Sequence, residues 1–375
     1  MQSLRSRSFD RILLIKPSAV GDVIHTLPVL VKLRARYPNA RIDWLLTPHI
    51  AELVRHHAAL SGFIAFAREQ YARSIRSWLG AGGLLQLPVL LRRNRYDLVI
   101  DLHGQFRSAV LALASGAPVR IGFDRPRGPA PTDRRLVPEA YKHGWTGARE
   151  GSWLAYTHRI PIPRLDAHAV DRYLWLAPIL GLDDDPPDMT IPIPPSADAR
   201  IDALLRREAP SAKPLAILVP GTQWQTKHWH GEGFAEVARH LTRTGRQVVL
   251  AGSSAERARC AAVAAWSPGV LDLCGRTTLS ELAALIRRAE VCVTNDSGSM
   301  HLAVALDRPV VSVFGPTDPV WIGPYGRPHA VVRAGVPCAP CYLRKLSQCP
   351  HAHRCMAQVK GATVIERVEI MLAAA

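Results

Sequence analysis

A carboxylate and an imidazole lie one helical turn apart near the start of the chain. Asp22 and His25 follow an apolar run at residues 12–15 and a turn that contains Pro17 and Gly21. Side chains three positions apart share one face of a helix. A carboxylate beside a ligand can accept a proton from a reacting hydroxyl group, but an aspartate at a helix start can also cap free amides. The residues alone leave both interpretations of Asp22 open.

Polar side chains also follow several apolar runs in the second half of the chain. Gly298 permits a ligand to approach the backbone closely, and the amides of Ser297 and Gly298 at a helix start would bind phosphate oxygens. Lys227 adds a positive charge for the same phosphates. The pattern indicates a nucleotide-diphosphate site, with ordinary caps and turns as the alternative. The candidates are Thr222, Lys227, Glu256, Asp296, Ser297, Gly298 and His301.

Four of the seven cysteines are clustered near the C-terminus. Their spacing is C-x2-C-x7-C-x5-C, formed by Cys338, Cys341, Cys349 and Cys355. Four thiolates at such spacing suit a structural zinc or iron ion. Reduced cysteines that pack a loop against the body are the alternative. A metal with four cysteine ligands would have no open position, so we expect it to be structural.

Apolar runs alternate with helical patterns in both halves of the chain. This alternation predicts an α/β protein with parallel sheets and helices on both faces. The proline-rich stretch 182–196 is the predicted linker between a domain at residues 1–185 and a second at residues 186–360, which contains the cysteine-rich segment 338–355. Two such domains form a cleft suited to two substrates.

Composition limits the kinds of partner. The formal net charge is +16, which favours an anionic membrane surface or a phosphorylated substrate. We find no nucleic-acid-binding motif, and no G-x-G-x-x-G, P-loop or G-x-S-x-G pattern. No run reaches the roughly 18 apolar residues of a membrane helix. The first ten residues lack the apolar core of a signal peptide, so we expect a cytosolic protein.

Longer stretches around these residues resemble a known family. The chain is similar to the ADP-heptose:lipopolysaccharide heptosyltransferases, glycosyltransferase family nine, at residues 16–28 (KPSAVGDVIHTLP) and 294–303 (TNDSGSMHLA). Shorter matches occur at residues 101–108, 227–229 and 315–318. The resemblance extends from about Arg11 to Arg367.

The resemblance implies the GT-B fold, in which two Rossmann-like domains face a cleft. The first domain would bind the acceptor and the second the nucleotide sugar, and the helix at residues 361–375 would pack back on the first domain. The family moves L-glycero-D-manno-heptose from ADP-heptose to the lipopolysaccharide inner core with inversion. The family's catalytic aspartate falls on Asp22. Its donor residues fall on Lys227, on Asp296, Ser297 and Gly298, and on His301, with looser matches at Thr222 and Glu256.

We assign the acceptor side to residues near Asp22 and to basic residues of the first domain. These are Ser18, Gly21, His25, Arg107 and Arg120. The arginines at residues 124–135 would suit the same anionic glycolipid.

The expected partners are therefore ADP-heptose and an anionic glycolipid, lipid A–Kdo or its heptosylated form. We expect peripheral association with the cytoplasmic surface of the inner membrane and no nucleic acid. Catalysis would require no cofactor, because Lys227 and helix-start amides can stabilise the leaving diphosphate. One alternative is a relative that transfers another sugar or glycosylates a protein such as an autotransporter. A second is a non-catalytic sugar-nucleotide-binding protein.

Overall fold

The computed structural model describes residues 4–66, 86–128 and 144–374. The chain divides into two compact units, one of residues 1–134 and 145–192 and one of residues 135–144 and 193–375. The boundary falls a few residues after the predicted one, because residues following 182 are held to the first unit. There, the ammonium group of Lys32 donates to the backbone oxygen of Asp185 at 2.7 Å and pairs with the carboxylate of Asp183.

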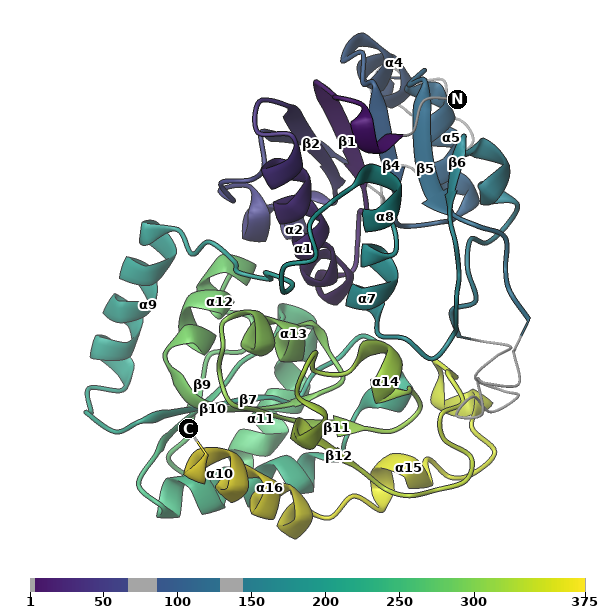
Figure 1. The fold of residues 1–375 in the computed structure, drawn as a ribbon. Coiled ribbons are helices and arrows are strands. Elements are labelled where there is room, and N and C mark those ends of the chain that lie inside the picture. Colours follow the sequence, from purple (N-terminus) through teal and green to yellow (C-terminus); the bar gives the residue numbers. More distant parts are fainter. Residues whose placement is uncertain (1–3, 67–85, 129–143, 375) are drawn as a thin grey trace. The chain divides into compact units, whose positions relative to one another are not determined.

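The first unit contains a parallel sheet of six strands within its described residues (Figure 1). The strand order is β3-β2-β1-β4-β5-β6, so the winding reverses between β1 and β4. The central strands are apolar because helices cover both faces of the sheet. The strands are β1 (Arg11–Ile15), β2 (Arg41–Leu46), β3 (Gly62–Ala65), β4 (Leu98–Asp101), β5 (Val119–Phe123) and β6 (His158–Ile160).

Helices cover this sheet in two layers. Helix α1 packs against α7, and α4 packs against α5. The elements are η1 (Leu4–Ser6), α1 (Val20–Arg36), α2 (Pro48–Val54), α4 (Gln86–Arg93), α5 (Phe106–Ala114), η3 (Ser152–Ala155), α7 (Ala169–Leu174) and α8 (Ala177–Leu180).

The second unit repeats the same topology. Its described residues form a parallel sheet of six strands in the order β12-β11-β10-β7-β8-β9. The winding here reverses between β7 and β10. The strands are β7 (Leu215–Val219), β8 (Gln247–Leu250), β9 (Leu271–Asp272), β10 (Ala289–Asn295), β11 (Val310–Phe314) and β12 (Val331–Arg333).

The helices of the second unit include one that the sequence analysis did not identify. Helix α9 begins inside the predicted linker, and Arg288 anchors it with bonds to Asp198 at 2.8 Å and Asp202 at 2.6 Å. The elements are α9 (Pro195–Glu208), η4 (Gln225–Lys227), α10 (Gly231–Arg243), η5 (Ser254–Glu256), α11 (Arg257–Ala265), α12 (Leu279–Arg287), α13 (Gly298–Ala305), α14 (Pro319–Ile322), η6 (Pro328–Ala330), η7 (Leu346–Gln348), α15 (Arg354–Ala357) and α16 (Gly361–Ala373).

Helix α16 corrects one expectation. We predicted that residues 361–375 pack back on the first domain, but the helix belongs to the second unit. It lies beside α10 (Figure 1). The reason is apolar burial, since Val364, Val368 and Met371 lie in the core formed with β10 and β11. His240 of α10 adds a 2.7 Å contact with Glu369.

Two expected features lie partly outside the described residues. From the sequence we also expect an arginine-rich helical region at residues 68–95, and the structure describes this stretch only from Gln86, where α4 begins. The arginines predicted at residues 124–135 are described only to residue 128. Among the described residues, no helix has the length and apolar character needed to cross a membrane.

Candidate active site

Asp22, Lys227 and Asp296, three of the predicted site residues, follow the strands at which the winding of each sheet reverses. In open α/β sheets, ligands bind at the carboxyl ends of the two strands that flank this point. In the first unit these are β1, followed by Lys16 and Asp22, and β4, followed by His103. In the second unit they are β7 and β10, and Lys227 and Asp296 follow them. Each unit therefore presents polar groups at the position where this topology places ligands.

The two carboxylate oxygens of Asp22 have different environments. Oδ2 accepts a hydrogen bond from the amide of Ala19 at 3.1 Å, which is the helix cap that the sequence allowed. Oδ1 accepts from the Tyr173 hydroxyl at 2.9 Å and lies 3.3 Å from Nζ of Lys16. The Asp22 side chain remains 39% exposed. The cap and the base are thus compatible roles of one side chain.

Charges around Asp22 set its protonation. Burial by itself would raise the pKa of Asp22, but the Lys16 charge, the Tyr173 hydroxyl and the Ala19 amide hold the pKa below its ordinary value of 3.8. Burial opposes the charge of Lys16, yet the neighbouring Asp22 raises the pKa of Lys16 overall. Burial, with the charge of Asp22, raises the pKa of Tyr173 to about 12. At neutral pH the site therefore holds an ionised carboxylate, an ammonium ion and a neutral phenol.

His25 lies beneath this loop. Its side chain is buried and makes an edge-to-face contact with the ring of His168, with centroids 4.9 Å apart. His168 in turn caps α7, where its Nδ1 accepts from the Val170 amide at 3.2 Å. These contacts favour a packing role for His25 between α1 and α7.

The other predicted acceptor residues occupy varied positions. Ser18 is half-buried in the loop after β1, and Gly21 is buried in the first turn of α1. The guanidinium of Arg120 donates to the carbonyl of Ala155 at 2.8 Å and of Ala117 at 2.6 Å, which is a structural role. Arg107 is exposed on α5.

In the second unit, Lys227 and Asp296 form a buried ion pair. Nζ of Lys227 lies 2.6 Å from Oδ2 of Asp296, and the same oxygen accepts from the Thr317 hydroxyl at 2.5 Å. The Thr222 hydroxyl donates to the Asp296 carbonyl at 3.0 Å. Lys227 also lies over the ring of Trp224 at 4.4 Å. Asp296 therefore orients Lys227, and its carboxylate offsets part of the positive charge that Lys227 could offer to a diphosphate.

The start of α13 offers hydrogen-bond donors to an anion. Ser297 is the N-cap residue of α13, and its hydroxyl is buried with no hydrogen-bond partner among the described residues. Its free hydroxyl, the free amides of the first turn and the helix dipole together suit phosphate oxygens. His301 is buried one turn along the same helix.

Glu256 lies beside the loops that follow β7 and β8. Its Oε2 accepts from the amide of Ser253 at 2.6 Å and from the Ser253 hydroxyl at 2.9 Å. A Cβ atom at Gly221 would lie 1.9 Å from Oε1 of Glu256, and one at Gly252 would lie 2.9 Å from Oε2. The two glycines thus permit the Glu256 carboxylate to lie against the loops after β7 and β8.

The cysteine-rich segment supports the loop that carries Lys227. The Thr226 hydroxyl donates to the carbonyl of Leu343 at 2.5 Å, and the His353 ring bonds the Thr226 carbonyl at 2.6 Å. Arg344 lies over the Trp224 ring at 4.6 Å. The segment therefore forms part of the framework that holds the Lys227 loop.

The predicted metal ligands within this segment are not assembled. Metal-type ligand atoms that all lie within 4.8 Å of one another are found, among the described residues, only for Cys260, Asp272 and Cys274. Cys338, Cys341, Cys349 and Cys355 form no such group. Burial, with the charges of the other three, raises the pKa of Cys355 to about 12, so this thiol is protonated at neutral pH.

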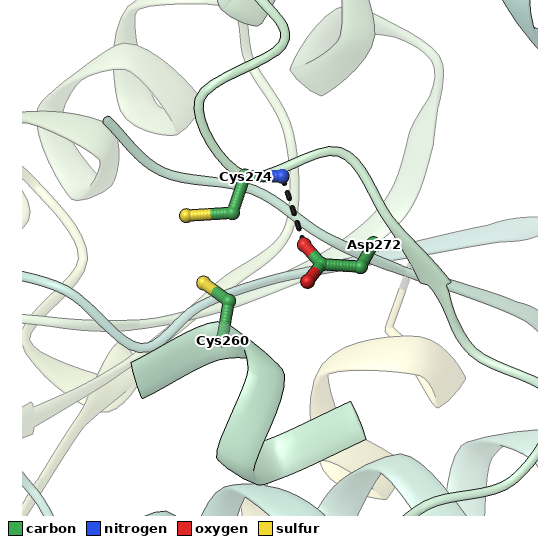
Figure 2. Close-up of side chains that lie close together, drawn as sticks. All are labelled: Cys260, Asp272 and Cys274. Carbon is green, nitrogen blue, oxygen red and sulfur yellow. Dashed lines mark hydrogen bonds between the residues drawn. The ribbon is translucent and has the colours of Figure 1, made fainter. Parts of the chain in front are cut away.

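The group that does assemble, Cys260, Asp272 and Cys274, lies next to the loop of Ser253. Figure 2 shows the Asp272 carboxylate accepting the Cys274 amide, at 2.9 Å, beside the sulfur atoms of Cys274 and Cys260. The Cys274 thiol also donates to the Ser253 carbonyl at 3.3 Å. Burial raises the pKa of both thiols. Both cysteines are thus protonated at neutral pH and pack the loop of Ser253, although two sulfurs and a carboxylate could hold a thiophilic ion.

The fold and the two groups of residues define a class of protein. Two Rossmann-like domains, one with an ionised carboxylate at the reversal of its sheet and one with a buried lysine–aspartate pair there, are the architecture of a GT-B glycosyltransferase. The chain belongs to glycosyltransferase family 9 (heptosyltransferase), whose family model matches residues 85–133 and 134–352.

Individual relatives agree with this assignment. Lipopolysaccharide heptosyltransferase 1 of Pseudomonas aeruginosa is 32% identical over 342 residues, which cover 91% of this chain and 88% of that protein. The protein of the same name from Salmonella typhimurium is 29% identical over 323 residues, covering 84% and 92%. The structure of E. coli heptosyltransferase WaaC with ADP-2-deoxy-2-fluoro heptose aligns with a TM-score of 0.69 and 26% identity, covering 96% of this chain and 99% of that one.

Sequence reasoning did not assign several residues that complete the two groups. Lys16 lies inside the quoted stretch 16–28, and Tyr173 is 151 positions from its partner Asp22. Thr317 lies in a matched stretch, but its bond to Asp296 is a tertiary contact. For Trp224 the sequence shows only an aromatic residue three positions before Lys227, which does not predict their contact.

Proposed function

We propose that the protein transfers L-glycero-D-manno-heptose from ADP-heptose to Kdo-bearing lipid A, with inversion at the anomeric carbon. Two relatives named lipopolysaccharide heptosyltransferase 1 support this acceptor. The aligned E. coli enzyme holds an analogue of ADP-heptose, which supports the donor. The observation that carries the proposal is the half-buried, ionised carboxylate of Asp22, held by Lys16 and Tyr173.

Asp22 is the general base of this reaction. It accepts the proton of the acceptor hydroxyl as that oxygen forms a bond to the anomeric carbon. The bond from that carbon to the diphosphate oxygen breaks on the opposite side, and ADP leaves with its electron pair. Lys16 keeps Asp22 ionised before the transfer, and Tyr173 fixes the orientation of the carboxylate through its hydrogen bond.

The second unit binds the departing ADP. The Ser297 hydroxyl and the amides at the start of α13 take phosphate oxygens, and Lys227 balances the developing negative charge. Glu256 is suited to the hydroxyl groups of the ribose, because a carboxylate accepts hydrogen bonds from them.

We propose that the transfer step uses no metal ion, because Lys227 and helix-start amides supply the positive charge. Treatment with a chelator tests this point. We expect unchanged activity in protein that elemental analysis shows to be free of metal. A structural zinc or iron at Cys338, Cys341, Cys349 and Cys355 is a separate proposal, and its thiols would have to close around the ion. An equimolar amount of either metal in purified protein would support it, and a trace amount would reject it.

The acceptor is anchored in lipid, so we place the protein at the cytoplasmic surface of the inner membrane. Its formal net charge of +16 favours such an anionic surface.

The decisive experiment is mass spectrometry of the products formed from ADP-heptose and three kinds of acceptor. These are Kdo-bearing lipid A, the same lipid already carrying one heptose, and an autotransporter protein. We expect one heptose to be added to the first acceptor only. Modification of the heptosylated lipid or of the protein alone would reject the proposed acceptor, and donor binding without any product would reject the enzyme.

A further inference from the structure

One layer of the first unit presents apolar side chains outward. Ten large apolar side chains are exposed among the described residues, and six of them belong to three elements of this unit. They lie on α4 (Val89 and Leu90), on α5 (Phe106, Val110 and Leu113) and on η3 (Leu154). We refer to these six residues as the apolar face.

The apolar face is the outer side of one helix layer. Leu87 and Leu91 of α4 and Leu111 of α5 point into one core against the sheet, so the opposite sides of the two helices point away from it. Helix α4 packs against α5, and η3 packs against α5 as well (Figure 1). On α5 the three exposed residues are spaced i, i+4 and i+7, which places them in one stripe.

Basic residues accompany this face. Arg92 and Arg93 are exposed on α4, and Arg107 is exposed on α5. The guanidinium of Arg92 reaches the C-terminal end of α5, where a Cβ at Gly116 would lie 3.2 Å from Nη1. Helices α4 and α5 and η3 contain no acidic residue. One carboxylate lies beside the face, that of Glu150, whose Oε2 accepts from the Phe106 amide at 3.1 Å.

We propose that the apolar face docks onto an anionic phospholipid bilayer. Exposed apolar stripes beside arginines are typical of helices that lie in the membrane interface. The apolar side chains would enter the acyl boundary, and the long arginine side chains would reach lipid phosphates. A protein partner of ordinary composition would not need the exclusively basic charge of these three elements. The proposal rests on the proposed function only in taking the bilayer to be the one that carries the lipid acceptor.

Vesicle sedimentation tests the docking surface directly. Leu113→Glu places a charge within the apolar face, and Ile370→Glu on α16 is its matched control, because these side chains are 50% and 51% exposed. With vesicles that contain phosphatidylglycerol, we expect Leu113→Glu to lower the partition coefficient about tenfold or more. We expect Ile370→Glu to bind like the wild type. Equal binding by Leu113→Glu and wild type, or an equal loss in both variants, would overturn the proposal.

A second pair of variants tests the contribution of the arginines to vesicle binding. Arg93→Gln should lower binding to anionic vesicles about fivefold, whereas the exposed Arg206→Gln on α9 should have less effect. Wild-type protein that binds neutral phosphatidylcholine vesicles equally well would contradict a role for the arginines. A wild-type dimer that Leu113→Glu converts to a monomer would assign the face to a second copy of the chain and reject the lipid.

The proposed transfer is measured separately with a delipidated, water-soluble acceptor. Leu113→Glu should keep wild-type kcat on this acceptor while losing activity on acceptor embedded in vesicles. Vesicle binding without transfer would reject the proposed function and support the docking surface. Transfer to the soluble acceptor without vesicle binding would support the proposed function and reject the docking surface.

Discussion

The protonation of Asp22 depends on two residues that come from different parts of the first unit. Lys16 directly follows β1, and Tyr173 belongs to α7. Their contacts offset the effect of burial on the Asp22 carboxylate. A base that is already ionised at neutral pH needs no preceding proton loss, so its function should persist far into the acid range.

Replacing Lys16 tests this control. We expect activity to be lost as the pH falls through the pKa of Asp22, which lies below 3.8 in the wild type. Lys16→Met removes the largest influence that lowers this pKa, and burial then raises it. We expect the acid limb of kcat/KM to move to higher pH. Profiles on a water-soluble acceptor, with exposed Lys213→Met as control, measure the shift, and an unmoved limb would argue against the role of Lys16.

The buried Ser297 hydroxyl leads to a second prediction at this scale. Because this hydroxyl has no hydrogen-bond partner among the residues that the structure describes, Ser297→Ala should not lower the melting temperature. The same change should weaken ADP binding about tenfold, since a hydrogen bond to a charged group contributes about 1.5 kcal/mol or more. Calorimetry and thermal unfolding measure both effects.

Ser312→Ala is the matched control for Ser297→Ala. Ser312 is buried in the same unit and bonds the Thr294 hydroxyl at 2.9 Å, so its loss should lower stability and spare ADP affinity. The opposite pattern in the two variants would remove Ser297 from the phosphate site.

At the scale of elements, loops after β7, β10 and β11 meet at Asp296, and the cysteine-rich segment holds the first of them in place. Thr226, Trp224 and His353 make the contacts that join this segment to the Lys227 loop. We therefore expect the segment to affect donor binding through the position of Lys227, whether or not it holds a metal.

Thr226→Val isolates this support. The change keeps the side-chain shape and removes the bond to the Leu343 carbonyl, so we expect about 1 kcal/mol lower stability and a severalfold higher KM for ADP-heptose. Thr244→Val, which removes a bond to the His240 carbonyl at 3.1 Å, should cost similar stability with unchanged KM. Equal KM values in both variants would mean that the segment does not position the Lys227 loop.

The elements themselves were largely predictable from local patterns. The strands at residues 41–46, 215–219 and 310–314 are examples, because each coincides with a short, mainly apolar run in the sequence. The short edge strands β6 and β12 and the helix α9 were missed. The edge strands have only three residues, and ion pairs to α12 hold α9 against the second unit.

At the scale of the whole molecule, the two units repeat one topology with different chemistry at the reversal of the winding. The first carries a carboxylate held by a lysine and a tyrosine, and the second carries a lysine held by a carboxylate. The sequence predicted both positions through the loops that follow apolar runs. It could not predict the partners Tyr173 and Thr317, or the docking of α16, because these depend on contacts between distant segments.

The placement of α16 is testable by stability. Val368→Ala removes methyl groups from a fully buried position in the core of the second unit, so it should lower the free energy of unfolding by about 2 kcal/mol. Ile370→Ala, on the exposed side of the same helix, should have little effect. Denaturant unfolding measures both, and equal stabilities would contradict the packing of this helix.

The role of Asp22 as the base is tested most directly by the rate of heptose transfer in Asp22→Asn, measured together with ADP affinity. We predict that kcat falls by about a thousandfold or more, in the range for loss of a general base, while ADP binds as to the wild type. Transfer by Asp22→Asn at the wild-type rate would contradict the account.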